Sequence, residues 1–173
     1  MPRRVECRSP SPERTREIAA VVAGVLAPGD VVALSGDLGA GKTCFVQGVA
    51  AALGVTEHVT SPSFVLVREY GSGTIPILHI DVYRLGNLQE LVDLGYEEFL
   101  DPKQIVLIEW GDAVGPLLPD EYLQIDVHAP TETDRLIELI ANGPGWAQRL
   151  ALIADRMRRL ESGELESGEL GGS

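Results

Sequence analysis

The stretch GDLGAGKT, residues 36–43, decides the fold of this chain. It fits the pattern GxxxxGK(S/T), and it lies between a short apolar segment, DVVALSG, that predicts a strand and a segment, FVQGVAAALG, whose apolar spacing predicts a helix. In such a unit the backbone N–H groups of the glycine-rich loop point at a phosphate group, and the helix N-terminus adds its positive end. We therefore predict an α/β fold whose loop binds a nucleoside triphosphate.

Two side chains of this loop, Lys42 and Thr43, are expected to contact different parts of a bound Mg²⁺-triphosphate. Lys42 is expected to reach the β- and γ-phosphates, and the Thr43 hydroxyl is a hard oxygen ligand suited to Mg²⁺. The chain has no Asn-Lys-x-Asp segment to recognise guanine, which favours ATP over GTP. The residues predicted to contact ATP in this region are Gly36, Asp37, Leu38, Gly39, Ala40, Gly41, Lys42, Thr43 and Cys44.

Composition limits what the rest of the chain does. The 173 residues, 45% of them hydrophobic, suffice for one domain with one core. The apolar stretches are too short to span a membrane and the N-terminus lacks a secretory h-region, so we expect a cytoplasmic protein without membrane contact. The two cysteines show neither a metal-binding spacing nor a disulfide framework. The net charge of −12 argues against direct binding to nucleic acid.

Outward from the loop, the pattern alternates between strands and helices. Ser11, Pro12 and Glu13 predict a helix start, and that helix is expected to end near Pro28. The segments 64–70 and 75–85 flank the turn-rich GSGT and predict a hairpin, so part of the sheet should be antiparallel. An amphipathic helix is expected over residues 87–100 and a buried strand over QIVLIEW, residues 104–110. The predicted architecture is a P-loop NTPase-like three-layer α/β/α domain with a mixed parallel and antiparallel central sheet.

The C-terminal third adds a second hairpin, a helix and a tail. Residues 121–129 and 133–141 alternate apolar with polar side chains around a polar turn. Residues 145–160 predict a helix whose apolar stripe docks on the core, although the same stripe would also suit a partner helix. The segment 161–173 repeats ESGEL and holds four glutamates without Lys or Arg; subtracting these charges from −12 leaves −8 for the rest. We predict one domain over 1–160 and a disordered acidic tail over 161–173.

A phosphate loop needs an acidic partner from a neighbouring strand end to help hold Mg²⁺, directly or through water. Glu109 follows an uninterrupted apolar strand, whereas Asp81 follows a segment broken by Pro76 and His79, as expected of an edge or hairpin strand. We therefore favour Glu109 as the metal ligand and keep Asp81 as a water-orienting group or general base. Thr60, in VTSPSF, is a further candidate for contact with the γ-phosphate.

Together, GDLGAGKT, VTSPSF, HIDVYRL and LIEW, in this order and spacing, resemble the TsaE (YjeE) family of small bacterial P-loop ATPases over roughly residues 8–150. The resemblance implies an ATPase required for the threonylcarbamoyladenosine modification of tRNA. It also implies that the protein acts as a switch on a complex of the transferase subunit and its companion protein. Contact with tRNA would then be indirect, through these partners.

Carried over by position, the resemblance implies that Thr43 and Glu109 ligate Mg²⁺, that Lys42 binds the ATP phosphates, and that Thr60 and Asp81 assist hydrolysis. It also places Trp110 beside the nucleotide. Family members often carry a Gly-Arg pair in the last hairpin near the nucleotide, and the nearest match here is Thr133 with the following Asp134 and Arg135. Cys44 stands where a second hydroxyl is usual.

Two other functions use the same loop. A small-molecule kinase would pass the γ-phosphate to a nucleoside or sugar, and such kinases usually carry an arginine-bearing lid. The sequence has no arginine cluster beyond DRMRRL, residues 155–160, near the predicted tail. A nucleotide-dependent binding module would use the γ-phosphate to order a loop and select a partner, with hydrolysis incidental. Without partners we expect slow turnover in either of the switch-like functions.

Overall fold

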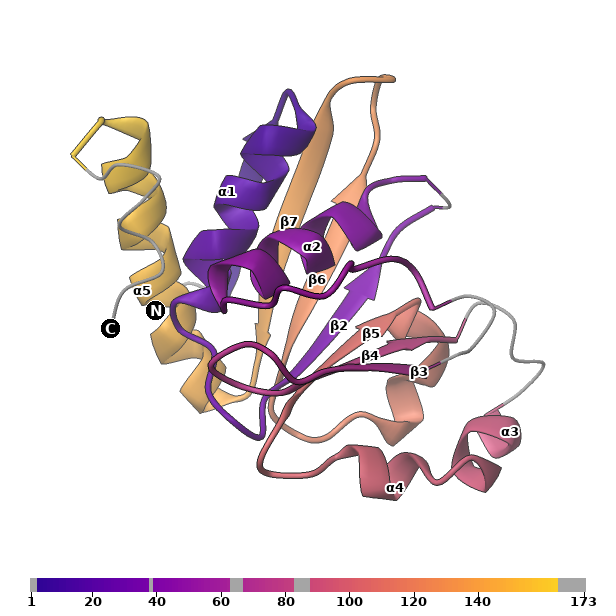
Figure 1. Cartoon of the computed structure of the whole chain (residues 1–173). Helices are drawn as coiled ribbons and strands as arrows, with labels where there is room; N and C mark the ends of the chain where they lie inside the picture. The colour runs from indigo at the N-terminus through magenta and orange to yellow at the C-terminus, as the bar shows by residue number, and fades with distance from the viewer. Residues whose placement is uncertain (1–2, 38, 63–66, 83–87, 165–173) are drawn as a thin grey trace.

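The computed structural model describes residues 3–37, 39–62, 67–82 and 88–164 of the chain. Seven strands lie in these ranges: β1 (Arg4–Ser9), β2 (Val31–Ser35), β3 (Val67–Tyr70), β4 (Ile77–Asp81), β5 (Ile105–Glu109), β6 (Tyr122–His128) and β7 (Arg135–Asn142). They form one sheet in the order β1-β7-β6-β2-β5-β4-β3 (Figure 1). Strand β2 runs parallel to β5 and β6, and β4 runs parallel to β5, while the other pairs are antiparallel. The predicted mixed sheet is confirmed.

Helices cover both faces of the sheet and give three layers (Figure 1). One face carries α1 (Pro12–Ala23), α2 (Lys42–Ala52) and α5 (Pro144–Glu161), and the other carries α3 (Leu88–Asp93), α4 (Tyr96–Phe99) and the 3₁₀ helix η1 (Gly111–Leu117). The side chains of β5 alternate between these layers: Ile105 and Leu107 pack in the first, Val106 and Ile108 in the second. An uninterrupted apolar strand is therefore covered on both sides, as its sequence predicts.

The first helix begins as predicted and ends early. The Ser11 hydroxyl accepts a hydrogen bond from the backbone N–H of Arg14 at 3.1 Å, and Pro12 occupies the first turn. The helix ends at Ala23, before the expected stop near Pro28, because Gly24 closes it and the chain then makes successive turns. The shorter helix still buries its apolar side against α2.

Two parts of the fold differ from the sequence-based prediction. The helix expected over residues 87–100 is divided into α3 and α4, because Gly95 adopts a left-handed conformation with φ 87°. Strand β1 is not predicted, although it forms the edge of the sheet beside β7. Strand β4 belongs to a hairpin with β3, one of the two arrangements predicted for it, and pairs with β5 on its other side.

The C-terminal helix docks on the core of the same chain, as the apolar stripe predicts. Trp146, Leu150, Ile153 and Met157 are all buried. Arg149 binds both carboxylate oxygens of Asp30 and stacks 3.7 Å from the centroid of the Trp146 ring. The helix includes Glu161, and most of the predicted tail, residues 165–173, lies outside the described ranges. No helix within those ranges is both long and apolar enough to cross a membrane.

Candidate nucleotide-binding site

The glycine-rich loop connects β2 to α2, as the motif predicts. Gly36 has φ 138°, and a Cβ placed there would lie 2.3 Å from the carbonyl oxygen of Val127 in β6. This close approach requires glycine and holds the start of the loop against the sheet. Helix α2 begins at Lys42, so its N-terminus faces into the loop. Leu38, which was predicted to contact ATP, lies outside the described residues.

Lys42 lies at the centre of this loop and is 5% exposed. Its ammonium donates hydrogen bonds to the carbonyl oxygens of Gly36 at 2.5 Å and Asp37 at 2.9 Å. Burial lowers the pKa of the Lys42 ammonium, and nearby carboxylates, Glu109 first among them, oppose that shift. Two carbonyl groups of the loop therefore hold the Lys42 ammonium at its centre.

Trp110 covers the Lys42 ammonium from the end of β5. The ammonium nitrogen lies 3.8 Å from the centroid of the Trp110 ring, a cation–π contact. Trp110 has φ 63° and ψ 38°, a left-handed conformation that costs a large side chain about 1–2 kcal/mol. The next residue, Gly111, allows this turn to pack on β2, since a Cβ there would lie 2.6 Å from the Cβ of Ala33. The turn thus places an aromatic ring directly above the phosphate loop.

Glu109 occupies the last position of β5 and is 2% exposed. Its Oε1 accepts a hydrogen bond from the Thr43 hydroxyl at 2.8 Å, and its Oε2 lies 2.5 Å from His79 Nε2. His79 was not proposed as a site residue, although His79 and Asp81 alternate in a buried strand and so share a face.

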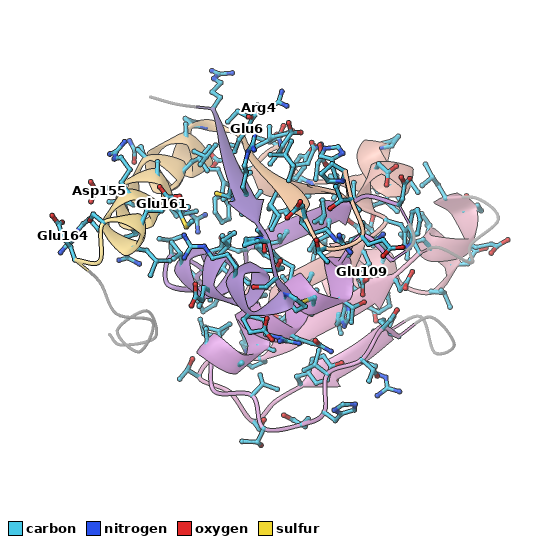
Figure 2. The ribbon with its side chains drawn as sticks, turned by 90° about the horizontal axis from the view of Figure 1, so that it is seen from above. Arg4, Glu6, Glu109, Asp155, Glu161 and Glu164 are labelled. Carbon is cyan, nitrogen blue, oxygen red and sulfur yellow. The ribbon has the colours of Figure 1, made fainter. Side chains whose placement is uncertain are left out.

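Thr43 and Glu109 fit the donor set that Mg²⁺ prefers. A hydroxyl oxygen and a carboxylate oxygen, both hard ligands, are already adjacent at the entrance of the loop. Glu109 is labelled within the body of the ribbon in Figure 2, and its side chain is buried. A buried carboxylate that points at the phosphate loop is suited to meet a cation, so these two residues can hold the metal together.

Asp81 lies beside Glu109, because the two residues are partners in the parallel register of β4 and β5. Asp81 is 3% exposed and accepts a hydrogen bond from the Ser61 hydroxyl at 2.8 Å. It is therefore not a surface carboxylate. The neighbouring candidate, Thr60, is half-buried and its carbonyl oxygen accepts a hydrogen bond from the Tyr70 hydroxyl at 3.4 Å. The structure thus brings Ser61, which we had not proposed as a site residue, to Asp81.

A cavity of about 480 Å³ opens beside the loop. It is lined by Gly41, Cys44 and Thr133, three of the predicted ATP contacts, together with the N-terminal segment around Pro10. Arg135, also in its wall, donates from Nε to the carbonyl oxygen of Ala40 at 2.7 Å. The last hairpin is therefore tied to the phosphate loop without the Gly-Arg pair of the TsaE pattern.

The Arg135 guanidinium also holds its own hairpin in shape. Its NH1 group donates to the carbonyl oxygens of Thr131, Glu132 and Asp134 at 3.1, 3.1 and 2.9 Å. One side chain thus links the turn that carries Thr133 to the loop that carries Ala40. The sequence does not predict the contact between Arg135 and Ala40, because two residues 95 positions apart leave no local pattern.

Comparisons with known proteins identify the family of this chain. The family described as "Threonylcarbamoyl adenosine biosynthesis protein TsaE" matches residues 9–137. The chain is 40% identical to the tRNA threonylcarbamoyladenosine biosynthesis protein TsaE of Bacillus subtilis, over 82% of this chain and 88% of that protein. It is 39% identical to the protein of the same name from Treponema pallidum, over 77% of this chain and 98% of that protein. 

A crystal structure of Bacillus subtilis YdiB superposes on the fold with a TM-score of 0.75. The two chains are 35% identical, and the superposition covers 93% of this chain and 98% of the other. The match extends beyond the phosphate loop, which many families share, to the whole mixed sheet and its helices. The chain belongs to the TsaE family.

Proposed function

We propose that this chain binds and hydrolyses Mg²⁺-ATP in support of the threonylcarbamoyladenosine modification of tRNA. One hydrogen bond is the main support for this proposal. The hydroxyl of Thr43, in the first turn after the phosphate loop, donates to the carboxylate of Glu109 at the end of a buried strand. Membership of the TsaE family supports the biological role, because the relatives are named for that modification.

The residues around the loop have separate tasks in this proposal. Lys42 neutralises charge on the β- and γ-phosphates, while the backbone N–H groups at the start of α2 bind their oxygens. The cavity lined by Cys44 and Thr133 receives the base and sugar of the nucleotide, and Trp110 covers the phosphates. Thr43 and Glu109 hold Mg²⁺, which when bound draws negative charge from the phosphate oxygens.

Hydrolysis requires that a water molecule be held in line with the γ-phosphate. Asp81 is the carboxylate available to orient that water or accept its proton, since it adjoins Glu109 and is held by Ser61. Thr60 supplies a hydroxyl from the same loop as Ser61. No covalent bond to the protein is involved, so catalysis rests on positioning and on charge stabilisation.

The output of the cycle is a change in partner binding. In the proposal, ATP-dependent ordering of residues around Thr60 alters how the chain engages the transferase and its companion subunit, in the cytoplasm. The net charge of −12 supports indirect action on tRNA, because an acidic chain gains little from phosphate contacts. Turnover by the chain alone is then slow and rises when the partner complex is present.

The proposal is tested by measuring phosphate release and threonylcarbamoyladenosine formation together. The full chain is incubated with Mg²⁺-ATP, with and without the transferase complex and tRNA. The expected result is that Lys42→Ala removes both phosphate release and modification. Modification that continues at the normal rate with this variant would contradict the proposed role. Transfer of the γ-phosphate to a nucleoside or sugar would instead identify a small-molecule kinase.

A further inference from the structure

One side of the sheet carries a group of polar side chains on β1, β7 and β6, and Asp126 in this group pairs with Ser35, the residue before the phosphate loop. The strands β1, β7 and β6 expose alternate residues on the face opposite α1 and α5, as the burial pattern of β1 and β6 shows. The helices α3, α4 and η1 pack on β2, β4 and β5 and leave this part of the face open. Figure 2 shows Arg4 and Glu6 on the outer strand at this edge, away from Glu109.

Three carboxylates lie in one row across these strands. The antiparallel register pairs Glu6 with Glu138 and Glu138 with Asp126, so the three side chains share a face. Like charges directly opposite one another destabilise a sheet unless a cation lies between them. Arg4 forms ion pairs with Glu138 and, at 3.6 Å, with Glu6. Among the described residues it is the one arginine or lysine that forms ion pairs with this row, and its two partners are Glu6 and Glu138.

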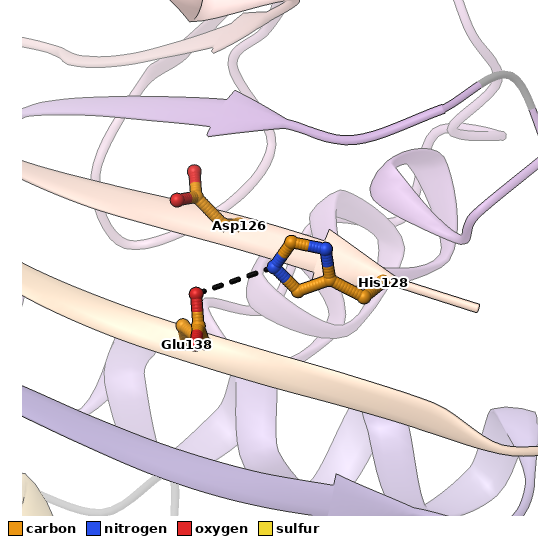
Figure 3. Close-up of side chains that lie close together, drawn as sticks. All are labelled: Asp126, His128 and Glu138. Atoms are coloured by element: carbon orange, nitrogen blue, oxygen red, sulfur yellow. Dashed lines mark hydrogen bonds and ion pairs between the residues drawn. The ribbon is translucent and has the colours of Figure 1, made fainter. Parts of the chain in front are cut away.

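His128 adds a nitrogen donor to the row. Its Nε2 lies 3.2 Å from Glu138 Oε2, and one donor atom each from Asp126, His128 and Glu138 lie within 4.8 Å of one another (Figure 3). The figure shows the Glu138 carboxylate turned toward the His128 imidazole, with Asp126 on the same strand as His128. Gln124 donates to both oxygens of Asp126 at 3.1 Å and so orients that carboxylate.

We propose that Asp126, His128 and Glu138 form a second metal site, which binds a divalent transition metal such as Zn²⁺. An imidazole nitrogen with two carboxylates suits Zn²⁺ better than Mg²⁺, which prefers oxygen ligands and keeps its water. Bonds of about 2.1 Å at tetrahedral angles separate two ligand atoms by about 3.4 Å, close to the distance between His128 and Glu138. A fourth position would be filled by water, because His128 lies open to solvent.

A metal bound at this site would link β6 to β7, because Asp126 and His128 belong to β6 and Glu138 belongs to β7. His128 ends β6, Arg135 begins β7, and the hairpin between them carries Thr133 at the nucleotide cavity. A metal bound to both strands would fasten the base of the hairpin that Arg135 ties to the phosphate loop. The inference is independent of catalysis, since metal binding is measured without ATP turnover.

The test is Zn²⁺ titration of the full chain by calorimetry, in buffer with excess Mg²⁺ and ADP so that the nucleotide site is occupied. We expect one tight equivalent for the wild-type chain and a loss of affinity of about tenfold or more for both His128→Gln and Asp126→Asn. His58→Gln is the matched control, since His58 is also exposed but lies in another loop, and it should bind as the wild type does.

Thermal unfolding with and without Zn²⁺ gives a second readout. Wild type and His58→Gln should both gain several degrees in Tm, whereas His128→Gln should not. Equal Zn²⁺ affinity in wild type and His128→Gln, or the absence of a tight equivalent in the wild type, would overturn the proposal. In that case His128 and Glu138 form an ordinary hydrogen-bonded pair beside Arg4.

Discussion

The Thr43 hydroxyl donates to the Glu109 carboxylate at 2.8 Å, although 66 positions separate the two residues. Parallel pairing of β2 with β5 produces this contact, because it brings the carboxyl ends of both strands to one edge of the sheet. The phosphate loop leaves β2 at that edge, and Glu109 ends β5 there. Burying the Glu109 carboxylate without partners would cost free energy, and this carboxylate has two partners, Thr43 and His79.

The charge of Lys42 should be essential for ATP binding or hydrolysis. We expect Lys42→Ala to lower the rate of phosphate release by about 100-fold or more, because it removes the buried charge that we propose to neutralise the phosphates. The measurement is phosphate release at saturating Mg²⁺. Lys103→Ala is the matched control, since Lys103 is the other lysine of the chain and is exposed. A rate equal to that of the control would contradict the assignment of the loop.

Substitutions of Glu109 and of Asp81 should change the Mg²⁺ dependence of ATP hydrolysis differently. Glu109→Gln removes the charge of the proposed metal ligand adjacent to Thr43, so we expect a rise of about tenfold or more in the Mg²⁺ concentration needed for half-maximal activity. Asp81→Asn should mainly lower the maximal rate, because Asp81 is proposed to act on water. A Mg²⁺ titration of both variants with the reverse ranking would exchange the two roles.

The parts of the site that could be predicted from the sequence depend on local patterns. Lys42 and Thr43 belong to a contiguous motif, and Glu109 ends an unbroken apolar run, so each is visible without knowing the fold. Ser61 and Arg135 act through partners far along the chain, Asp81 and Ala40 respectively. Such contacts depend on strand order and register, which hydrophobic periodicity alone does not determine.

The errors in the predicted fold have similar physical causes. Gly95 was counted as part of a helical face, but its left-handed conformation starts a new helix instead. Strand β1 is not predicted because its sequence lacks a clear apolar alternation. Three charged residues, Arg4, Glu6 and Arg8, lie on its outer side, and only two buried positions alternate with them. His79 and Pro76 predict an edge or hairpin strand; β4 is a hairpin strand that also pairs with β5, and the bond of His79 to Glu109 allows this polar side chain to lie in the interior.

The two cysteines should react very differently with thiol reagents. Burial raises the pKa of Cys7 to about 11, so at pH 8 about one molecule in a thousand carries the reactive thiolate, and the side chain is inaccessible. Burial also raises the pKa of Cys44, but this residue is only half-buried and lines the cavity beside the loop. Labelling followed by mass spectrometry should therefore find modification at Cys44 first, and faster as the pH rises.

Nucleotide should protect Cys44 from this labelling if the cavity receives the base and sugar. We expect Mg²⁺-ADP to slow modification of wild type by about tenfold, which corresponds to 90% occupancy, and to leave Lys42→Ala unprotected. Cys44→Ser provides the background of Cys7 alone. Labelling of Cys44 at the same rate with and without saturating nucleotide would show that the base binds elsewhere.

Close packing between α1 and α2 should depend on Gly48. A Cβ at this position would lie 2.7 Å from the Cβ of Ala19 and 2.8 Å from the Cα of Arg16. Alanine favours a helix interior by about 1 kcal/mol over glycine, but overpacking costs about 1–3 kcal/mol. We expect Gly48→Ala to lower the free energy of unfolding by up to about 2 kcal/mol, measured by urea denaturation. Gly71→Ala, where no atom lies within 4 Å of the new Cβ, should change it little.

His79 should act by holding Glu109 in place for the metal. Its Nε2 is hydrogen-bonded to Glu109 Oε2 at 2.5 Å, and the side chain is fully buried. His79→Phe keeps a ring of similar size but removes the hydrogen-bonded nitrogen, so Glu109 Oε2 loses its partner and the carboxylate is free to turn away from Thr43. We expect the Mg²⁺ concentration for half-maximal activity to rise by about tenfold, as for other residues that orient metal ligands.

The control for this prediction is nucleotide binding measured without Mg²⁺, by protection of Cys44 from labelling. It should change little in His79→Phe, because the loop, Lys42 and the cavity keep their contacts. A purely structural role for His79 predicts a different result: a lower Tm, weaker nucleotide protection and an unchanged Mg²⁺ requirement. A variant that needs more Mg²⁺ while retaining metal-free nucleotide binding would establish that His79 positions Glu109.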